Sequence, residues 1–219
     1  MTAKHKGGLV VILGVGFILS LPILLQSTDE EKQHLVQNTP QVQIIQRQMN
    51  LESINPVERQ RIQVELRQTP SLETPSSEQD IWISMMAPKI IQFDVSEREA
   101  RSIAKWVWVY AQSHQLDPAL ILALITVESR FDSFATSIVG AQGLMQVMPF
   151  WKKELGSPED DLFNIATNIR YGCAILKHYI KRYRTVEKAL AAYNGSKGRV
   201  KYPNKIMSQM PRYQFKQAP

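Results

Sequence analysis

The chain has 219 residues, 44% of them hydrophobic and 21% charged, which is enough for one domain with a core of its own. Its net charge of +6 is the sum of +2 over residues 1–26, −4 over residues 27–95 and +8 over residues 96–219. The basic C-terminal part favours a polyanionic partner, but it shows no basic and aromatic stripe of the kind that binds nucleic acid. We therefore expect no nucleic-acid partner.

Cysteine and histidine usage argues against a disulfide, a metal site or a cofactor. Cys173 is the only cysteine, and it falls in an apolar stripe at helical spacing, as a small buried hydrophobic residue does. The histidines are scattered and lack the spacing of metal ligands; they are His5, His34, His114 and His178. We expect no metal and no cofactor.

Residues 7–28 carry no charge, and two lysines precede them while three acidic residues follow. As a helix they would extend about 33 Å, enough to cross a hydrocarbon core of about 30 Å. Residues 1–28 are therefore predicted to form a cytoplasmic tip and a single transmembrane helix, with the remainder in the periplasm. A cleaved signal peptide is the alternative, but the apolar stretch is long for one and lacks an Ala-x-Ala site.

Residues 29–95 are predicted to form a polar, partly disordered tether. They are rich in Gln, Glu, Arg and Ser and contain five prolines. Within them, the stretch VERQRIQVELRQ at residues 57–68 has the composition of an isolated polar helix. Such a tether would let a domain act at a distance from the membrane.

Residues 96–219 are predicted to form an all-α domain, because helix signals recur and no alternating strand pattern is present. Helix starts are indicated at Ser96, Asp117, Asn164 and Thr185, each before a helical apolar pattern. A left-handed helix stop is indicated at Asn194-Gly195.

Glu128 is the most informative residue, because it ends an almost wholly apolar helix that begins after Pro118. Such a helix is buried. Desolvation and the negative helix end both raise the pKa of a carboxyl placed there, which suits a general acid. The alternative is a glutamate that leaves the helix end to pair with a lysine.

Other polar and glycine residues interrupt apolar segments further along the chain. Gly143 lies in a glycine-punctuated turn, GAQGLMQ, in which Met145 and Gln146 offer a soft apolar contact and an amide. Asn168 interrupts an apolar helix face, and Tyr193-Asn194 ends another helix with a hydroxyl and an amide. Individually, each pattern also fits ordinary packing.

Together these pieces resemble the lytic transglycosylases with a goose-lysozyme-like catalytic domain. The resemblance covers roughly residues 98–205 and rests on four blocks in order: Glu128-Ser129, GAQGLMQVMP (140–149), NIRYG (168–172) and ALAAYNG (189–195). One departure is the loop GSKG at 195–198, where many members have Ala-Gly-x-Gly after AYN.

The resemblance implies a lysozyme-like helical fold and Glu128 as catalytic acid/base. It implies that Ser129, Gln146 and Tyr193 hold Glu128 and the sugar, with the Tyr193 hydroxyl reaching one or the other. Met145, Asn168 and Tyr171 would line the glycan groove, and the expected substrate-binding set is Ser129, Gly143, Met145, Gln146, Asn168, Tyr171, Tyr193 and Asn194.

The expected reaction is cleavage of peptidoglycan glycan strands between N-acetylmuramic acid and N-acetylglucosamine with Glu128 acting alone, since the nearby Asp132 looks like a turn residue. The resemblance implies a 1,6-anhydromuramyl product. Two alternatives remain, a goose-type lysozyme-like hydrolase and a non-catalytic wall-binding anchor of a transenvelope secretion or conjugation machine. Cell-envelope machinery is a possible partner.

Overall fold

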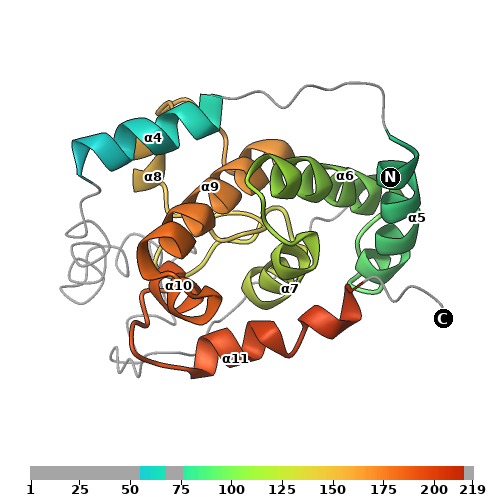
Figure 1. Cartoon of the computed structure of the whole chain (residues 1–219). Coiled ribbons are helices and arrows are strands. Elements are labelled where there is room, and N and C mark those ends of the chain that lie inside the picture. The colour runs from blue at the N-terminus through green and yellow to red at the C-terminus, as the bar shows by residue number, and fades with distance from the viewer. Residues whose placement is uncertain (1–54, 68–75, 215–219) are drawn as a thin grey trace, which may run out of the picture.

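A computed structural model describes residues 55–67 and 76–214, and these form a helical domain (Figure 1). The described residues contain two isolated β-bridges within residues 136–147 but no strand. The helices are α4 (Pro56–Arg67), α5 (Ser77–Ile91), α6 (Glu97–Ser113), α7 (Pro118–Glu128), α8 (Phe150–Leu155), α9 (Ile165–Tyr183), α10 (Val186–Tyr193), α11 (Lys201–Met207) and the 3-10 turn Met210–Arg212. The expected all-helical fold is thus confirmed for this part of the chain.

Four helices begin where the sequence predicts, because a short polar side chain satisfies a free backbone N–H at each start. Ser96 accepts a hydrogen bond from the Glu99 N–H at 3.2 Å before α6. Asp117, Asn164 and Thr185 do the same before α7, α9 and α10. The stop after α10 is also as expected, since Gly195 has φ +70°.

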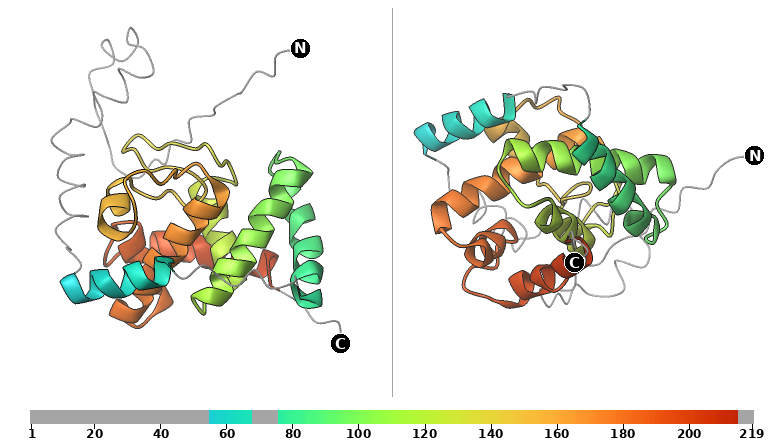
Figure 2. Two further views of the ribbon diagram at one scale, coloured as in Figure 1. Left: turned by 90° about the horizontal axis from the view of Figure 1, so that it is seen from above. Right: turned by 45° about the vertical axis from the view of Figure 1, so that its right-hand side comes forward.

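Helix α7 lies at the centre of the domain. Its residues from Ala119 to Ile125 are all buried, as expected for a helix that is apolar on every side. Figure 1 shows α6 above α7 and α11 below it, and both helices pack against it. Loops connect α7 to α8 and α8 to α9, and Figure 2 shows them gathered at one end of the domain. This arrangement surrounds the C-terminal end of α7 with elements from distant parts of the sequence.

Helices α4 and α5 correct the prediction of a tether over residues 29–95. Helix α5 buries Trp82 and Met86 and packs along α6, where the rings of Trp82 and Trp108 lie 5.4 Å apart. Helix α4 packs on α8 and α9 and buries Ile62 and Leu66, which are one turn apart. The compact part therefore begins well before Ser96.

The polarity of α4 concealed its docking, because two buried residues in twelve leave its composition polar. Its attachment is completed by polar contacts to the end of α8: Arg59 pairs with Glu154 at 2.6 Å, and the Gln63 amide donates to the Glu154 carbonyl at 3.2 Å. Residues 29–54 and 68–75, also assigned to the tether, lie outside the described part of the chain.

Across the described residues, the structure contains no helix of the length and apolarity that crossing a membrane requires. The segment predicted to form the transmembrane helix, residues 7–28, lies outside these residues. Membrane anchoring therefore stays a prediction.

Candidate active site

Glu128 is the last residue of α7, and only 4% of its surface is exposed. Burial raises the pKa of its carboxyl from 4.5 to about 7, while a hydrogen bond from Tyr202 and the positive charge of Lys205 act in the opposite direction. Near neutral pH the carboxyl is therefore divided between its protonated and ionised forms. Such a group can both donate and accept a proton.

Tyr202 is the hydrogen-bond partner of Glu128, and sequence reasoning missed it. Its hydroxyl donates to Oε1 of Glu128 from the first turn of α11. Burial and the neighbouring Glu128 raise the pKa of this hydroxyl well above 10, so it stays protonated and remains a donor. The only sequence signal for Tyr202 was its place in a basic segment, RVKYPNK, shortly after Tyr193 and the loop GSKG at 195–198.

The turn after Glu128 has an unusual backbone. Ser129 is fully buried, and its hydroxyl accepts from the Phe131 N–H at 3.2 Å and donates to the Ile125 carbonyl at 3.4 Å. Arg130 and Phe131 follow with φ of 53° and 68°, a conformation that residues other than glycine seldom adopt. Ser129 thus fixes the turn that ends α7, and its predicted role toward the sugar stays a prediction.

Asn168 holds the loop that carries Gly143 and Met145. Its amide oxygen accepts from the Met145 N–H at 2.7 Å, and its amide nitrogen donates to the carbonyls of Gln142 at 2.8 Å and Leu162 at 2.6 Å. Gly143 has φ +70°, and an added Cβ would lie 2.4 Å from the amide nitrogen of Asn168. This glycine is therefore required by packing within the chain and by its backbone angle.

Met145, Asn168 and Tyr171 are at most 1% exposed, so their side chains lie in the interior. Met145 packs over Gly172, where an added Cβ would lie 2.3 Å from its sulfur. We expected these three side chains to line a groove. Asn168 and the packing of Met145 on Gly172 hold this loop, whereas the Tyr171 hydroxyl bonds to Asp160 between α8 and α9. Direct contact of these side chains with sugar stays a prediction.

Tyr193 lies under the same loop. Its hydroxyl donates to the Met145 carbonyl at 2.8 Å, and burial followed by the nearby Glu128 raises its pKa well above 10. Gln146 is half-buried with φ +49°, and its amide nitrogen donates to the carbonyls of Ala135 at 3.1 Å and Gly143 at 3.0 Å. Tyr193 thus lies beside Glu128 but bonds to the loop, whereas Tyr202 bonds to the carboxyl.

Residues 107–215 match the family model of the transglycosylase SLT domain. The chain carries a transglycosylase SLT domain. Helices α7 to α11, and with them Glu128, Tyr202 and the loop held by Asn168, all fall inside the matched segment. Helices α4 and α5 precede it.

Curated relatives match the same part of the chain. A transglycosylase of Enterobacteria phage PRD1 is 36% identical over 114 residues, which is 48% of this chain and 42% of the phage protein. The membrane-bound lytic murein transglycosylase F of Desulfosudis oleivorans is 36% identical over 107 residues, 46% of this chain and 23% of that protein. The membrane-bound lytic murein transglycosylase C of Actinobacillus pleuropneumoniae is 32% identical over 139 residues, 54% of this chain and 37% of that protein. The chain thus spans less than half the length of each of these relatives.

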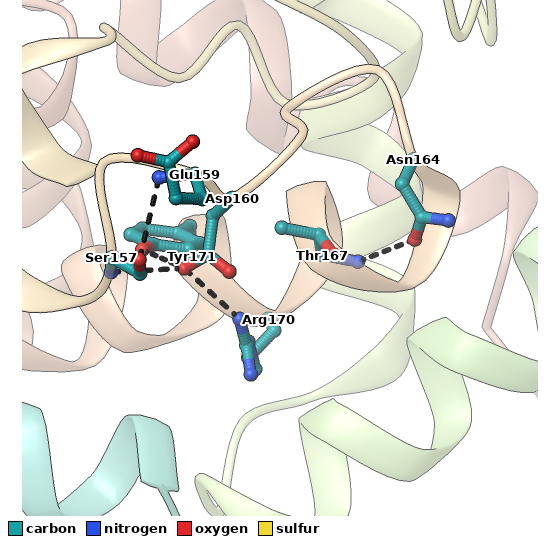
Figure 3. A network of polar contacts seen from close by, with 7 residues as sticks. All are labelled: Ser157, Glu159, Asp160, Asn164, Thr167, Arg170 and Tyr171. Carbon is teal, nitrogen blue, oxygen red and sulfur yellow. Dashed lines mark hydrogen bonds and ion pairs between the residues drawn. The ribbon is translucent and has the colours of Figure 1, made fainter.

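Tyr171 stabilises the loop between α8 and α9 of the SLT domain (Figure 3). Its hydroxyl donates to Oδ2 of Asp160, which also pairs with Arg170 at 3.3 Å and accepts from the Ser157 N–H at 3.2 Å. Burial and Asp160 raise the pKa of Tyr171 far above its usual range. An added Cβ on Gly156 would lie 1.7 Å from the Tyr171 hydroxyl, so this glycine provides the space for the ring.

The last two residues that the sequence analysis singled out, Asn194 and Asp132, lie at turns. Asn194 is exposed at the end of α10, and its expected contact with substrate stays a prediction. Asp132 accepts the Phe134 N–H at 2.9 Å, as a turn residue does, in keeping with the interpretation drawn from the sequence. The described residues contain no group of three or more His, Cys, Asp or Glu that could hold a metal ion.

Proposed function

We propose that this protein is a peptidoglycan lytic transglycosylase that cleaves the β-1,4 bond between N-acetylmuramic acid and N-acetylglucosamine. The observation that carries the proposal is the buried carboxyl of Glu128, with a pKa of about 7, within the segment that matches the SLT domain. The proposal concerns the whole chain, of which its curated relatives match about half.

Glu128 acts first as an acid. Its protonated carboxyl gives a proton to the glycosidic oxygen as the bond from that oxygen to C1 of the muramyl sugar breaks. The carbonyl oxygen of the 2-acetamido group of the same sugar stabilises the positive charge that develops at C1. Glu128 is left as a carboxylate, which the Tyr202 hydroxyl stabilises through its hydrogen bond to Oε1.

Glu128 acts next as a base. Its carboxylate takes the proton of the muramyl 6-hydroxyl while that oxygen forms a bond to C1. The acetamido group is released, the carboxyl is protonated again, and the product is a 1,6-anhydromuramyl end. No water is consumed, so the reaction differs from hydrolysis by one water in product mass.

A mechanism with one carboxyl group fits the surroundings of Glu128. Enzymes that hydrolyse glycosides with two carboxyl groups place both beside the scissile bond. Among the described residues, the groups that perturb the carboxyl of Glu128 are a tyrosine and a lysine, Tyr202 and Lys205, and not a second acid. Asp132, the nearest acid in the sequence, is engaged in its own turn.

A purely wall-binding anchor is disfavoured for the same reason. Burying a carboxyl at the end of an apolar helix destabilises the folded state once the group ionises. A binding module gains nothing from that cost, whereas an acid/base catalyst requires the shifted pKa. Any role beside cell-envelope machinery would come in addition to catalysis.

We further propose that residues 7–28 anchor the chain in the inner membrane and place the SLT domain in the periplasm. The support is the uncharged stretch itself, with lysines before it and acidic residues after it, and two relatives whose names describe them as membrane-bound. The full chain should stay with membranes through salt and alkaline washes. Recovery of a chain that begins near residue 27 would show a cleaved signal peptide instead.

The catalytic proposal is tested by digesting purified sacculi with the full chain in detergent and weighing the released muropeptides. We expect ends that are one water lighter than hydrolysis products, and no release by Glu128→Gln. Glu159→Gln, which changes an exposed carboxyl in the same way, is the matched control and should keep full activity. Products of hydrolytic mass would show a lysozyme-like hydrolase, and release by Glu128→Gln at a tenth of the normal rate would refute the role of Glu128.

A further inference from the structure

The backbone after Glu128 adopts an unfavourable conformation that both local and distant groups contact. Arg130 and Phe131 are consecutive residues with positive φ, and bulky side chains make that region unfavourable. Such a conformation persists only where neighbouring groups enforce it. Part of the enforcement is local: the N–H groups of Ser129 and Arg130 both donate to the Ile125 carbonyl, at 3.0 and 3.1 Å.

A further contact comes from Phe93, which lies in the turn two residues after the end of α5. The ring of Phe131 is fully buried, and its centre lies 5.0 Å from that of Phe93. The guanidinium of Arg130 lies over the same Phe93 ring, 5.3 Å from its centre. Phe93 thus contacts the side chains of both residues in the unfavourable conformation.

A second cation fixes Phe93 in place. The guanidinium of Arg212 lies 4.9 Å from the centre of the Phe93 ring and also donates to the side-chain oxygen of Gln92. The Lys89 ammonium donates to the Arg212 carbonyl at 2.8 Å. Figure 1 shows the end of the red C-terminal segment, residues 210–214, lying beside the lower end of α5. The end of α5 and the C-terminal segment are therefore joined by three separate contacts.

The C-terminal segment also holds α7 on the other side of Glu128. The hydroxyls of Tyr213 and Thr126 share a hydrogen bond of 2.7 Å, and Thr126 donates to the Leu122 carbonyl within α7. The Tyr213 ring in turn lies 6.3 Å from that of Phe131. Glu128 thus sits between Thr126 and Phe131, and both are held by one connected group of side chains.

We propose that Phe93 is a positioning residue for Glu128, acting through the turn at residues 129–131. The proposal rests on the proposed function for its catalytic part. Phe93 lies ahead of residue 107, where the match to the SLT domain begins, so on this proposal the turn after Glu128 depends on a residue outside the matched segment. A misplacement of about 1 Å at a reacting group can lower turnover about a hundredfold.

Phe93→Ala tests the proposal with two readouts, amide hydrogen exchange and turnover on sacculi. We expect the amides of residues 129–132 to exchange at least about tenfold faster, because the turn loses the ring that holds it. We expect kcat to fall about tenfold or more while KM changes little, because Glu128 is displaced and the sugar contacts are not. Phe93→Tyr keeps the ring and both cation contacts, and it should restore both readouts.

Trp106→Ala is the matched control. Trp106 is also a partly buried aromatic residue that stacks on another ring, Tyr110 at 5.6 Å, and lies beneath a cation, Lys105 at 5.3 Å. Its removal should lower the melting temperature comparably and leave exchange at residues 129–132 unchanged. If Phe93→Ala does not fold, Phe93→Leu is measured instead, which keeps apolar volume and removes the aromatic face.

The two readouts separate the two proposals. If wild-type protein cleaves no sacculi, the proposed function fails, and hydrogen exchange still reports on the turn. If exchange at residues 129–132 does not respond to loss of the Phe93 ring, or responds equally to Trp106→Ala, Phe93 does not hold the turn. If exchange rises while kcat stays within twofold of an active wild type, the turn does not position Glu128.

Discussion

Replacing the carboxyl of Glu128 with an amide should make the folded protein more stable at alkaline pH. The pKa of this carboxyl rises from 4.5 to about 7 on folding, because burial penalises the charged form. The folded state therefore binds the proton more tightly than the unfolded chain does. The stability that this binding contributes is fully present below pH 4.5 and is lost as the pH rises through 7.

The size of the effect follows from the difference between the two pKa values. Each pKa unit corresponds to about 1.4 kcal/mol, so ionising Glu128 in the fold costs about 3 kcal/mol at pH 9. Glutamine has nearly the same shape and is never charged, so Glu128→Gln avoids this cost. For a domain of this size about 3 kcal/mol corresponds to a rise in melting temperature of roughly 6–12 °C.

Thermal unfolding of wild type and Glu128→Gln is compared at pH 4 and pH 9. The two melting temperatures should be close at pH 4, where the wild-type carboxyl is protonated, and the variant should melt higher at pH 9. Glu159→Gln, which alters an exposed carboxyl, should not change the dependence on pH. If Glu128→Gln gains nothing at pH 9, the carboxyl is not held in a desolvated site, and the physical basis for its role as an acid is removed.

Three further substitutions distinguish residues that affect turnover from residues that stabilise the loop carrying Gly143 and Met145. Tyr202→Phe removes a hydrogen bond that lowers the pKa of Glu128, so the alkaline limb of the kcat–pH profile should move to higher pH and turnover should fall about tenfold. Tyr193→Phe leaves the buried Met145 carbonyl without its donor, and thermal melts should show a loss of about 1–3 kcal/mol. Asn168→Leu removes three hydrogen bonds to buried backbone groups, and urea unfolding should show a loss of about 3 kcal/mol or more.

Local features of the fold could be predicted because their causes lie within a few residues. The helix starts at Ser96, Asp117, Asn164 and Thr185 depend on a side chain bonding a backbone N–H two or three positions ahead. The burial of Glu128 was likewise predictable, because the apolar run before it leaves α7 no solvent-facing side.

The partners of buried polar groups could not be predicted in the same way. An amide such as Asn168 in an apolar helix must be paired, but the pattern does not distinguish a sugar from backbone groups of a distant loop. Tyr202 and Tyr193 presented the same difficulty. Both lie near Glu128, and only the path of the chain from α10 into α11 decides which hydroxyl reaches the carboxyl. The docking of α4 was concealed because it depends on two apolar residues in a polar segment.

The surroundings of Glu128 contain groups that raise its pKa and groups that lower it, and the proposed reaction needs both. A single residue that acts as acid and then as base needs a pKa close to the working pH, because each half of the reaction requires the other protonation state. The apolar helix α7 alone would push the pKa upward and leave a carboxyl that releases its proton poorly. Tyr202 and Lys205, both from α11, lower the pKa and stabilise the carboxylate. A shift or loss of α11 should therefore impair proton release from Glu128, even though the acid and the helix that buries it would be unchanged.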